Sequence, residues 1–437
     1  MSAQSPTATN PSVKRLAAIL GLLLLAAIAV RLISDSRRIP SAPPVPPLSM
    51  DDSSAVLPES PPPVPADNIE TLRAAHAQVD RLASAAAPAA QEQRAEAALN
   101  CGDLWSADES ARAVLKVLPN NRPARLSLAA SLRRLAQFDA AEKIYRQLLR
   151  EDSRDSDAYL GLADTTFAAN RRPEAFKWLE VGANLGAQTP VSLSTIAHRY
   201  QDWTAFPLAE GVAVRAVQVA PGNIDSLLQL ASIQVESGRL DAAYGTLETI
   251  FKKDSNNELA HRLMGVVLMN ATYSHPDINR ARSLLERAVE LNARDIDIYS
   301  TAAVIYRQQR LYRLAAQAYD AMLHLDPTSL EGRYGLGQVY ALLGKTDLSR
   351  KQLEMYKQLD DRHRKVIRLL EDVTHHPASS KEHAALARYL QSIGNYGTAL
   401  PEYQTAATLD PRDTALRKEI NRFYARLGWK SPESKLL

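Results

Sequence analysis

Gly344-Lys345-Thr346 resembles the end of a phosphate-binding loop, in which backbone amides and a lysine hold phosphate oxygens. Such a loop needs another glycine five residues before Gly344, but Val339 occupies that position and Gly337 comes two residues too early. The tripeptide also falls in a turn between two expected helices, whereas a phosphate loop follows a strand. The spacing therefore argues against a nucleotide site.

The residues with metal-binding or nucleophilic chemistry form no motif. Four of the nine histidines lie close together in sequence: His363, His375, His376 and His383. They leave two readings open, a metal site and surface histidines at an exposed junction, and no carboxylate or cysteine spacing supports the metal. The single cysteine, Cys101, excludes an internal disulfide, and either packs as a small residue or forms a disulfide with another chain. We therefore predict no metal, no cofactor and no catalytic residue; an enzyme with a groove site is a remote alternative.

Composition limits the function classes further. The 437 residues are 46% apolar and 23% charged, which is normal for a folded protein. With 17 glycines and 6% aromatic residues, the chain lacks the turn glycines and β-branched runs of an all-β protein. The net charge of +3 is too small for a dedicated nucleic-acid binder.

An apolar run near the N-terminus predicts a membrane anchor. Residues 16–30 carry no charge, and Leu32 and Ile33 extend the run past Arg31, whose side chain can reach the interface. Lys14 and Arg15 precede it, as in an export signal. We expect a signal-anchor helix over 16–33 after a short tail, 1–15, with a cleaved signal peptide as the alternative. The basic-then-apolar order favours an extracytoplasmic C-terminal part, and the cytoplasmic face stays open.

A proline-rich segment follows at 34–66. Ten prolines lie between positions 40 and 65, and proline fixes φ and removes a backbone donor. Neither a helix nor a sheet is expected there. The composition predicts a semi-rigid linker that holds the remainder of the chain away from the membrane.

The rest of the chain has an internal repeat of 34 residues. One alanine series shows the spacing at Ala129, Ala163, Ala197 and Ala231, and a second shows it at Ala107, Ala141, Ala175, Ala209 and Ala243. Two small positions per period require two helices that approach closely. We divide the array into nine units: 88–121, 122–155, 156–189, 190–223, 224–257, 258–295, 296–329, 330–363 and 380–413.

This pattern resembles the tetratricopeptide repeat (TPR) family, which places small residues at positions 8 and 20 of each unit and a large residue near position 24. Position 24 is aromatic here at Tyr145, Tyr319 and Tyr403. The resemblance implies an all-α helix-hairpin solenoid, a right-handed superhelix of about nine repeats. Units one to eight occupy 67–363 with a front helix, an inserted helix or linker occupies 364–379, and a ninth unit, 380–413, precedes a capping helix and tail, 414–437. The insertion either continues the second helix of unit eight or adds another helix.

In this family the first helices line a concave groove, through positions 2, 5, 9, 12 and 13. The resemblance therefore implies a protein-binding groove with these residues: Asp157, Asp164, Phe167, His198, Asp202, Asp225, Glu236, Arg262, Arg307, Tyr334 and Arg388. Units three to five supply five acids and no lysine or arginine at those positions. A peptide with a basic segment is the partner that this charge favours, and solvated helix faces are the alternative.

Anchor and array together predict a membrane-anchored scaffold that binds proteins or peptides. An envelope assembly, secretion or polysaccharide-export complex would suit an extracytoplasmic array. A cytoplasm-facing adaptor that recruits a soluble enzyme or protease is the alternative, and topology separates the two. Self-association stays open.

Overall fold

A computed structural model describes residues 52, 55, 57, 58 and 67–429, except 271 and 293. The predicted tail 1–15, the membrane anchor 16–33, most of the linker and the last residues of the tail lie outside this part. Within the described ranges every regular element is an α-helix, and no helix combines the length and hydropathy that a bilayer span requires.

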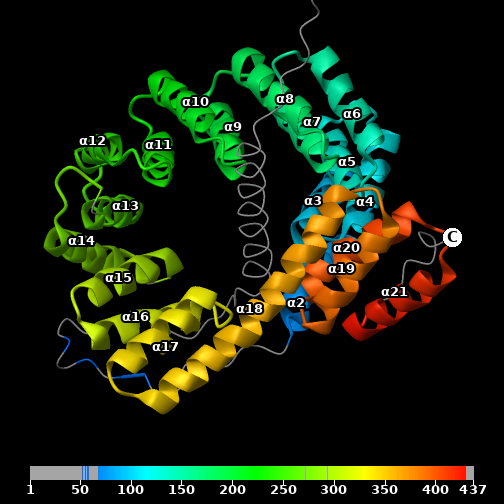
Figure 1. The fold of residues 1–437 in the computed structure, drawn as a ribbon. Coiled ribbons are helices and arrows are strands. Elements are labelled where there is room, and N and C mark those ends of the chain that lie inside the picture. Colours follow the sequence, from blue (N-terminus) through cyan, green and yellow to red (C-terminus); the bar gives the residue numbers. More distant parts are fainter. Residues whose placement is uncertain are drawn as a thin grey trace, which may run out of the picture.

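The helices follow each other as antiparallel pairs (Figure 1). In the described part of the chain, a front helix, α2 (Ile69–Leu82), and a last helix, α21 (Thr414–Leu427), flank nine pairs. The first helices of the pairs are α3 (Pro88–Cys101), α5 (Arg122–Arg134), α7 (Ser156–Ala168), α9 (Pro190–Asp202), α11 (Ile224–Glu236), α13 (Glu258–Met269), α15 (Ile296–Gln308), α17 (Leu330–Leu342) and α19 (Ser380–Ser392). The second helices are α4 (Leu104–Val117), α6 (Phe138–Glu151), α8 (Arg172–Leu185), α10 (Phe206–Val219), α12 (Leu240–Phe251), α14 (Ile278–Leu291), α16 (Tyr312–Leu325), α18 (Thr346–His375) and α20 (Tyr396–Leu409).

Local sequence explains where the helices begin and end. The first helices of units two to eight are capped by a polar side chain that accepts a hydrogen bond from a backbone N–H of the first turn: Asn121, Asp155, Thr189, Asn223, Asn257, Asp295 and Ser329. The turn between the two helices of a pair places one residue in the left-handed region in every unit except the sixth, among the described residues. Gly344 is that residue in unit eight, with φ of 71°, so Gly344-Lys345-Thr346 forms a helix-to-helix turn.

The small residues at the two repeating positions are fully buried where helices cross. Ala129, Ala163 and Ala197 each expose 0% of their surface, as do Ala141 and Ala175 on the second helices. A larger side chain at these positions would hold the paired helices apart. The all-α repeat solenoid expected from the alanine spacing is therefore the fold.

The array closes into a ring, which the expectation of a superhelix did not include. Figure 1 shows the last units lying beside the first ones, and α20 contacts both α2 and α4. Leu72 and Trp105 from the beginning of the chain share one apolar cluster with Leu386 and Phe423 from its end. We call this contact between α2, α4, the end of α5 and the group α19–α21 the seam.

The insertion between units eight and nine lengthens the helix that reaches the seam. Of the two arrangements left open by the sequence, the structure has the continuous one, because α18 runs through 364–375 without a break. Val366 and Leu369 on this extension are buried in the seam cluster beside α19. The extension thus carries unit nine to the position where it meets unit one.

The interpretation of 34–66 as a stalk needs a correction at Ala55 and Leu57. Ala55 exposes 1% of its surface and belongs to the apolar cluster of units five to eight. Leu57 packs against the same cluster. These two apolar side chains gain burial by packing on the array, so Ala55 and Leu57 do not belong to a free stalk.

Candidate functional site: the inner face and the seam

The first helices form the inner face of the ring. Successive first helices contact each other all along units one to eight, from α3 with α5 to α15 with α17 (Figure 1). In a curved array, alternate helices come close on the side with the shorter path. The predicted groove residues therefore belong to helices of the inner side, apart from Arg388, which lies on α19 at the seam.

The predicted groove acids of units three and four lie beside Arg122 of unit two and Arg199 of unit four. Arg122 donates to Asp155 at 2.7 Å and to Asp157 at 2.6 Å. Arg199 lies 2.8 Å from Asp164 and 2.9 Å from Asp202. Both arginines escaped the sequence count because they occupy positions 1 and 10 of their units. Two arginines thus reduce the negative charge around Asp157, Asp164 and Asp202, three of the five predicted groove acids.

Polar contacts between neighbouring first helices continue around the ring. Gln201 donates to Glu236 at 2.6 Å, and Arg307 donates to Gln338 at 2.8 Å. Arg262 lies 3.9 Å from Asp295, and Arg388 holds the Glu419 carboxylate with two contacts of 2.9 Å. His198 lies 3.7 Å from Asp202, whereas Asp225 is exposed in the first turn of α11. Each contact between units joins residues 31 to 35 apart, so most of the predicted site residues brace adjacent units.

Apolar side chains remain exposed on the first helices. Val191 exposes 75% of its surface, Tyr334 44% and Leu342 55%. The sequence analysis omitted Leu342 from the predicted site, although position 13 of unit eight identifies it. Phe167 stacks on Trp203 at 4.3 Å between ring centroids. These side chains have no charge to satisfy, and they are the inner-face groups that a partner segment can cover.

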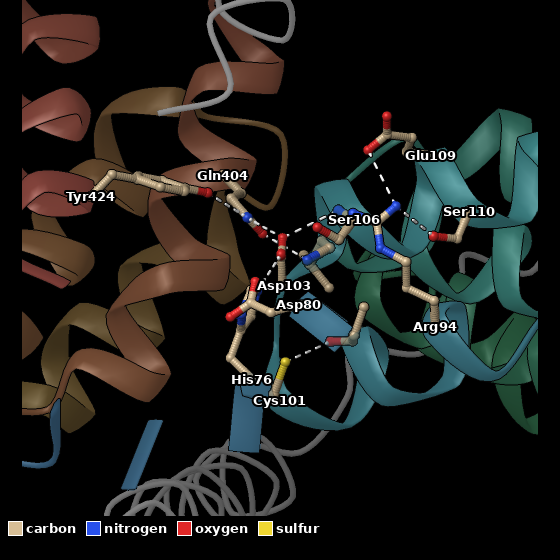
Figure 2. Close-up of polar contacts among 12 residues, drawn as sticks. His76, Asp80, Arg94, Cys101, Asp103, Ser106, Glu109, Ser110, Gln404 and Tyr424 are labelled. Atoms are coloured by element: carbon tan, nitrogen blue, oxygen red, sulfur yellow. Dashed lines mark hydrogen bonds and ion pairs between the residues drawn. The ribbon is translucent and has the colours of Figure 1, made fainter. Parts of the chain in front are cut away.

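The seam is held by a buried polar network around Gln404 (Figure 2). The Gln404 side-chain carbonyl accepts from the backbone N–H of Leu104 at 2.7 Å. Its amide group donates to Asp103 and to the Tyr424 hydroxyl, each at 2.8 Å. Gln404 exposes 0% of its surface, and each of its polar groups has a partner. An amide buried this way fixes unit nine in one register against unit one.

Asp103 and His76 form the charged part of this network. The His76 Nε2 atom lies 2.9 Å from Asp103 Oδ2, and Nδ1 lies 3.2 Å from Asp80 (Figure 2). Burial lowers the pKa of His76, but its hydrogen bonds and attraction to Asp103 and Asp80 outweigh burial and raise the pKa above 6.5. Burial raises the pKa of Asp103, but donors from His76, Ser106 and Gln404 outweigh it and lower the pKa below 3.8. The pair is therefore an ion pair in mildly acidic solution.

The two ends of the described helical array complete the seam. Asn68 accepts from the backbone N–H of Tyr396 at 2.7 Å and so adds a cap to α20. Arg73 donates to the carbonyl of Leu427 at 2.9 Å. The His76 ring stacks on Trp429 with centroids 4.0 Å apart. The first and last described helices thus cover each other's ends, as terminal units of a repeat array must be covered.

A pocket of about 420 Å³ opens beside the seam. Its lining residues are Asp67, Arg388, Gln391, Ser392, Gly394, Tyr396, Tyr403, Glu419 and Arg426. Its two cations are engaged: Arg388 pairs with Glu419, and Arg426 lies over the Tyr396 ring at 5.2 Å. The pocket therefore has polar walls whose two arginines already contact other side chains.

The histidines and the cysteine that the sequence singled out do not converge. His383 is buried between Glu402, at 2.6 Å, and the Pro377 carbonyl, at 3.1 Å. No group of three or more potential ligands among His, Cys, Asp and Glu is found in the described part of the chain. The Cys101 thiol contacts the Ala98 carbonyl, and burial raises its pKa to about 11. A thiol with such a pKa is a poor nucleophile at neutral pH.

Comparison with known proteins identifies the repeat. Models of the tetratricopeptide repeat match residues 205–266 and residues 126–189 and 300–362. The BBSome complex member BBS4 homolog of Drosophila melanogaster is 24% identical over 215 residues, which are 47% of this chain and 41% of that protein. The chain thus matches about two fifths of that relative's length.

Solved structures share parts of the array at low identity. The crystal structure of MamA is 20% identical and has a TM-score of 0.34, covering 39% of this chain and 97% of that one. The APC/C hetero-tetramer Cut9-Hcn1 is 14% identical and has a TM-score of 0.38, covering 76% of this chain and 63% of that one.

Proposed function

From a chain that carries tetratricopeptide repeats and closes them into a ring, we propose a scaffold that holds a protein or peptide segment against its inner face. Repeats of this kind serve protein interaction, and no residue arrangement described above performs chemistry. We place the partner across the first helices of units three, four and eight. Apolar side chains of the partner make the main contacts there.

One observation supports this choice of partner. Three of the five acids on the inner face, Asp157, Asp164 and Asp202, already contact an arginine. Val191, Tyr334 and Leu342 are exposed on the same face. A basic segment would first have to displace Arg122 and Arg199 from their carboxylates. An apolar anchor removes exposed apolar surface from water, which contributes about 25 cal/mol per Å², and large apolar or aromatic anchors dominate the energy of most interfaces.

Matched substitutions on the two faces test the inner face. Leu342→Asp and Val191→Asp are expected to weaken partner binding by about tenfold or more each, because a partner would bury the new charge. The controls are Leu208→Asp and Val219→Asp on the second helix of unit four, where the wild-type side chains are exposed by 51% and 50%. Those controls should bind as the wild type does.

A photo-crosslinker placed in the protein in cells identifies the partner for that binding assay. Placed at Tyr334 or Leu342, it should give a discrete adduct, and placed at Arg146 on α6 it should give none. Equal labelling of both faces, or loss of binding in the Leu208 and Val219 variants alone, would remove the inner face as the binding surface.

The scaffold is further proposed to be tethered to a membrane through residues 16–33, with its array outside the cytoplasm in an envelope assembly, secretion or export complex. The support is the apolar run with its preceding basic residues. Deleting 16–33 should move the chain from the carbonate-resistant membrane fraction to the supernatant. Protease should cut the array in cells whose outer barrier has been opened while the cytoplasmic membrane stays closed. Protection until the cells are lysed would favour the cytoplasm-facing adaptor instead.

A further inference from the structure

A carboxylate from the proline-rich segment caps a helix of unit seven. Asp52 Oδ1 accepts from the backbone N–H of Arg313 at 2.7 Å and from that of Leu314 at 3.0 Å. These two residues are the second and third of α16, whose own N-cap residue, Leu311, offers no side-chain acceptor. Asp52 thus satisfies donors that the helix itself leaves open, and its negative charge suits the helix N-terminus.

The residues that follow Asp52 continue the contact. Ala55 is buried, and its carbonyl accepts from the Arg313 guanidinium at 3.3 Å. Leu57 packs against the apolar cluster of the array, and the Pro58 carbonyl accepts a hydrogen bond from the Tyr340 hydroxyl. The contact has polar groups at both ends and apolar burial between them. This is how folded domains recognise short extended segments.

We propose that the edge formed by α16 and α17 is a peptide-binding site separate from the inner face, and that Asp52, Ala55, Leu57 and Pro58 of the same chain occupy it. The site takes an acidic residue, then a small residue three positions later, then leucine and proline at positions five and six. The small residue is required because Ala55 exposes only 1% of its surface. The ring therefore binds a segment of its own chain that precedes the repeats. We call this segment, with Asp52, Ala55, Leu57 and Pro58, the arm.

Binding of the arm to unit seven has a consequence that rests on the proposed membrane anchor. With 16–33 in a bilayer and Asp52 fixed on unit seven, only residues 34–51 remain as a spacer. A fully extended polyproline-II chain of this length spans roughly 55 Å at ~3.1 Å per residue. The side of the ring formed by units seven and eight would then face the membrane.

Hydrogen exchange in the full chain tests the site without a membrane or a partner. In Asp52→Ala the amides of Arg313 and Leu314 should exchange roughly five to ten times faster, which corresponds to the loss of a helix cap. Asp51→Ala is the matched control, with the same change of charge one residue earlier. Unchanged exchange of both amides in Asp52→Ala would overturn the assignment.

A trans-binding assay shows whether the site recognises the segment as a peptide. In Ala55→Arg, the large charged side chain should expel the arm while far-ultraviolet circular dichroism stays helical. A fluorescent peptide with the sequence of residues 50–60 should then bind the variant at least about ten times more tightly than it binds the wild type, whose site is filled. Equal affinity for both proteins would overturn the proposal. So would protection of the two amides that rises with protein concentration, because the arm would then come from a second copy.

Discussion

Replacing Asp103 by alanine is expected to open the ring and to cost about 3–5 kcal/mol at the seam, the effect of removing one partner from a buried ion pair. The variant leaves His76 with only the exposed carboxylate of Asp80 and leaves the Gln404 amide without one acceptor. It also removes the cap of α4, because Asp103 accepts from the backbone N–H of Ser106. Small-angle scattering should show a larger radius of gyration, and the Leu104 amide should lose its protection from exchange.

Asp277→Ala provides the control for this prediction. Asp277 caps α14 in unit six by accepting from the backbone N–H of Arg280, far from the seam. Its loss should cost only about 1 kcal/mol, the usual value for a cap, and should leave the scattering profile unchanged. A ring that stays closed in Asp103→Ala, with the Leu104 amide still protected, would show that apolar packing alone holds the seam.

The same ion pair predicts the direction in which pH acts on the seam. The raised pKa of His76 means that its contribution is complete below pH 6.5 and is lost as pH rises through the folded-state pKa. The lowered pKa of Asp103 means that its contribution is present above pH 3.8 and is lost as pH falls through its folded-state pKa. Leu104 protection should therefore be greatest in mildly acidic solution and decline towards alkaline pH. In His76→Gln the alkaline decline should disappear.

Gly335→Ala is expected to destabilise the array by about 1–3 kcal/mol through overpacking. A Cβ atom on Gly335 would lie 2.2 Å from Cζ of Tyr319, whose ring is buried in the preceding unit. The ring cannot move aside without disturbing its neighbours, because protein interiors are close-packed. Thermal and urea denaturation should both show the loss. The same relation joins Gly161 to Tyr145, where the distance would be 2.1 Å.

Two further variants separate this clash from the general effect of alanine in a helix. Gly245 lies in α12 with no atom within 4 Å of a Cβ, so Gly245→Ala should be neutral or stabilising by up to ~1 kcal/mol. In a Tyr319→Leu background, Gly335→Ala should become nearly neutral, because the obstructing ring is gone. A double-mutant cycle measures this coupling, and additive effects of the two substitutions would contradict the explanation.

The local architecture of the array was readable from the sequence. The first helices of the nine proposed units begin at the residues where those units begin, and α21 covers the predicted 414–427. This succeeds because contacts between helices of one pair, and between one pair and the next, join residues within one or two repeat lengths. Small side chains recur wherever these contacts are closest. The aromatic residue at position 24 was visible in the sequence as well. That Tyr145 and Tyr319 require a glycine in the next unit was not visible, because this depends on the direction in which the tyrosine side chain points.

The candidate site was predicted only in outline. The first helices do form the inner face, but the sequence count overstated the negative charge of the groove by omitting Arg122 and Arg199. Their side chains reach the acids of neighbouring units across a helix face, so position within a unit does not decide which charges meet. Leu342 was omitted although its position was known, since charge and aromaticity guided the selection.

The sequence by itself determined the repeat, the helix limits and the inner and outer helices, because all three depend on patterns within one or two units. Only the tertiary structure decided that the array closes on itself. Gln404 meets Leu104 across 300 residues, and no local pattern marks either of them. Closure depends on the small rotation between units, which accumulates over nine repeats, and on the length of α18, which sets the last unit against the first. The tertiary structure likewise decided that Asp52 lies on unit seven, since a cap from a distant segment leaves no periodic trace.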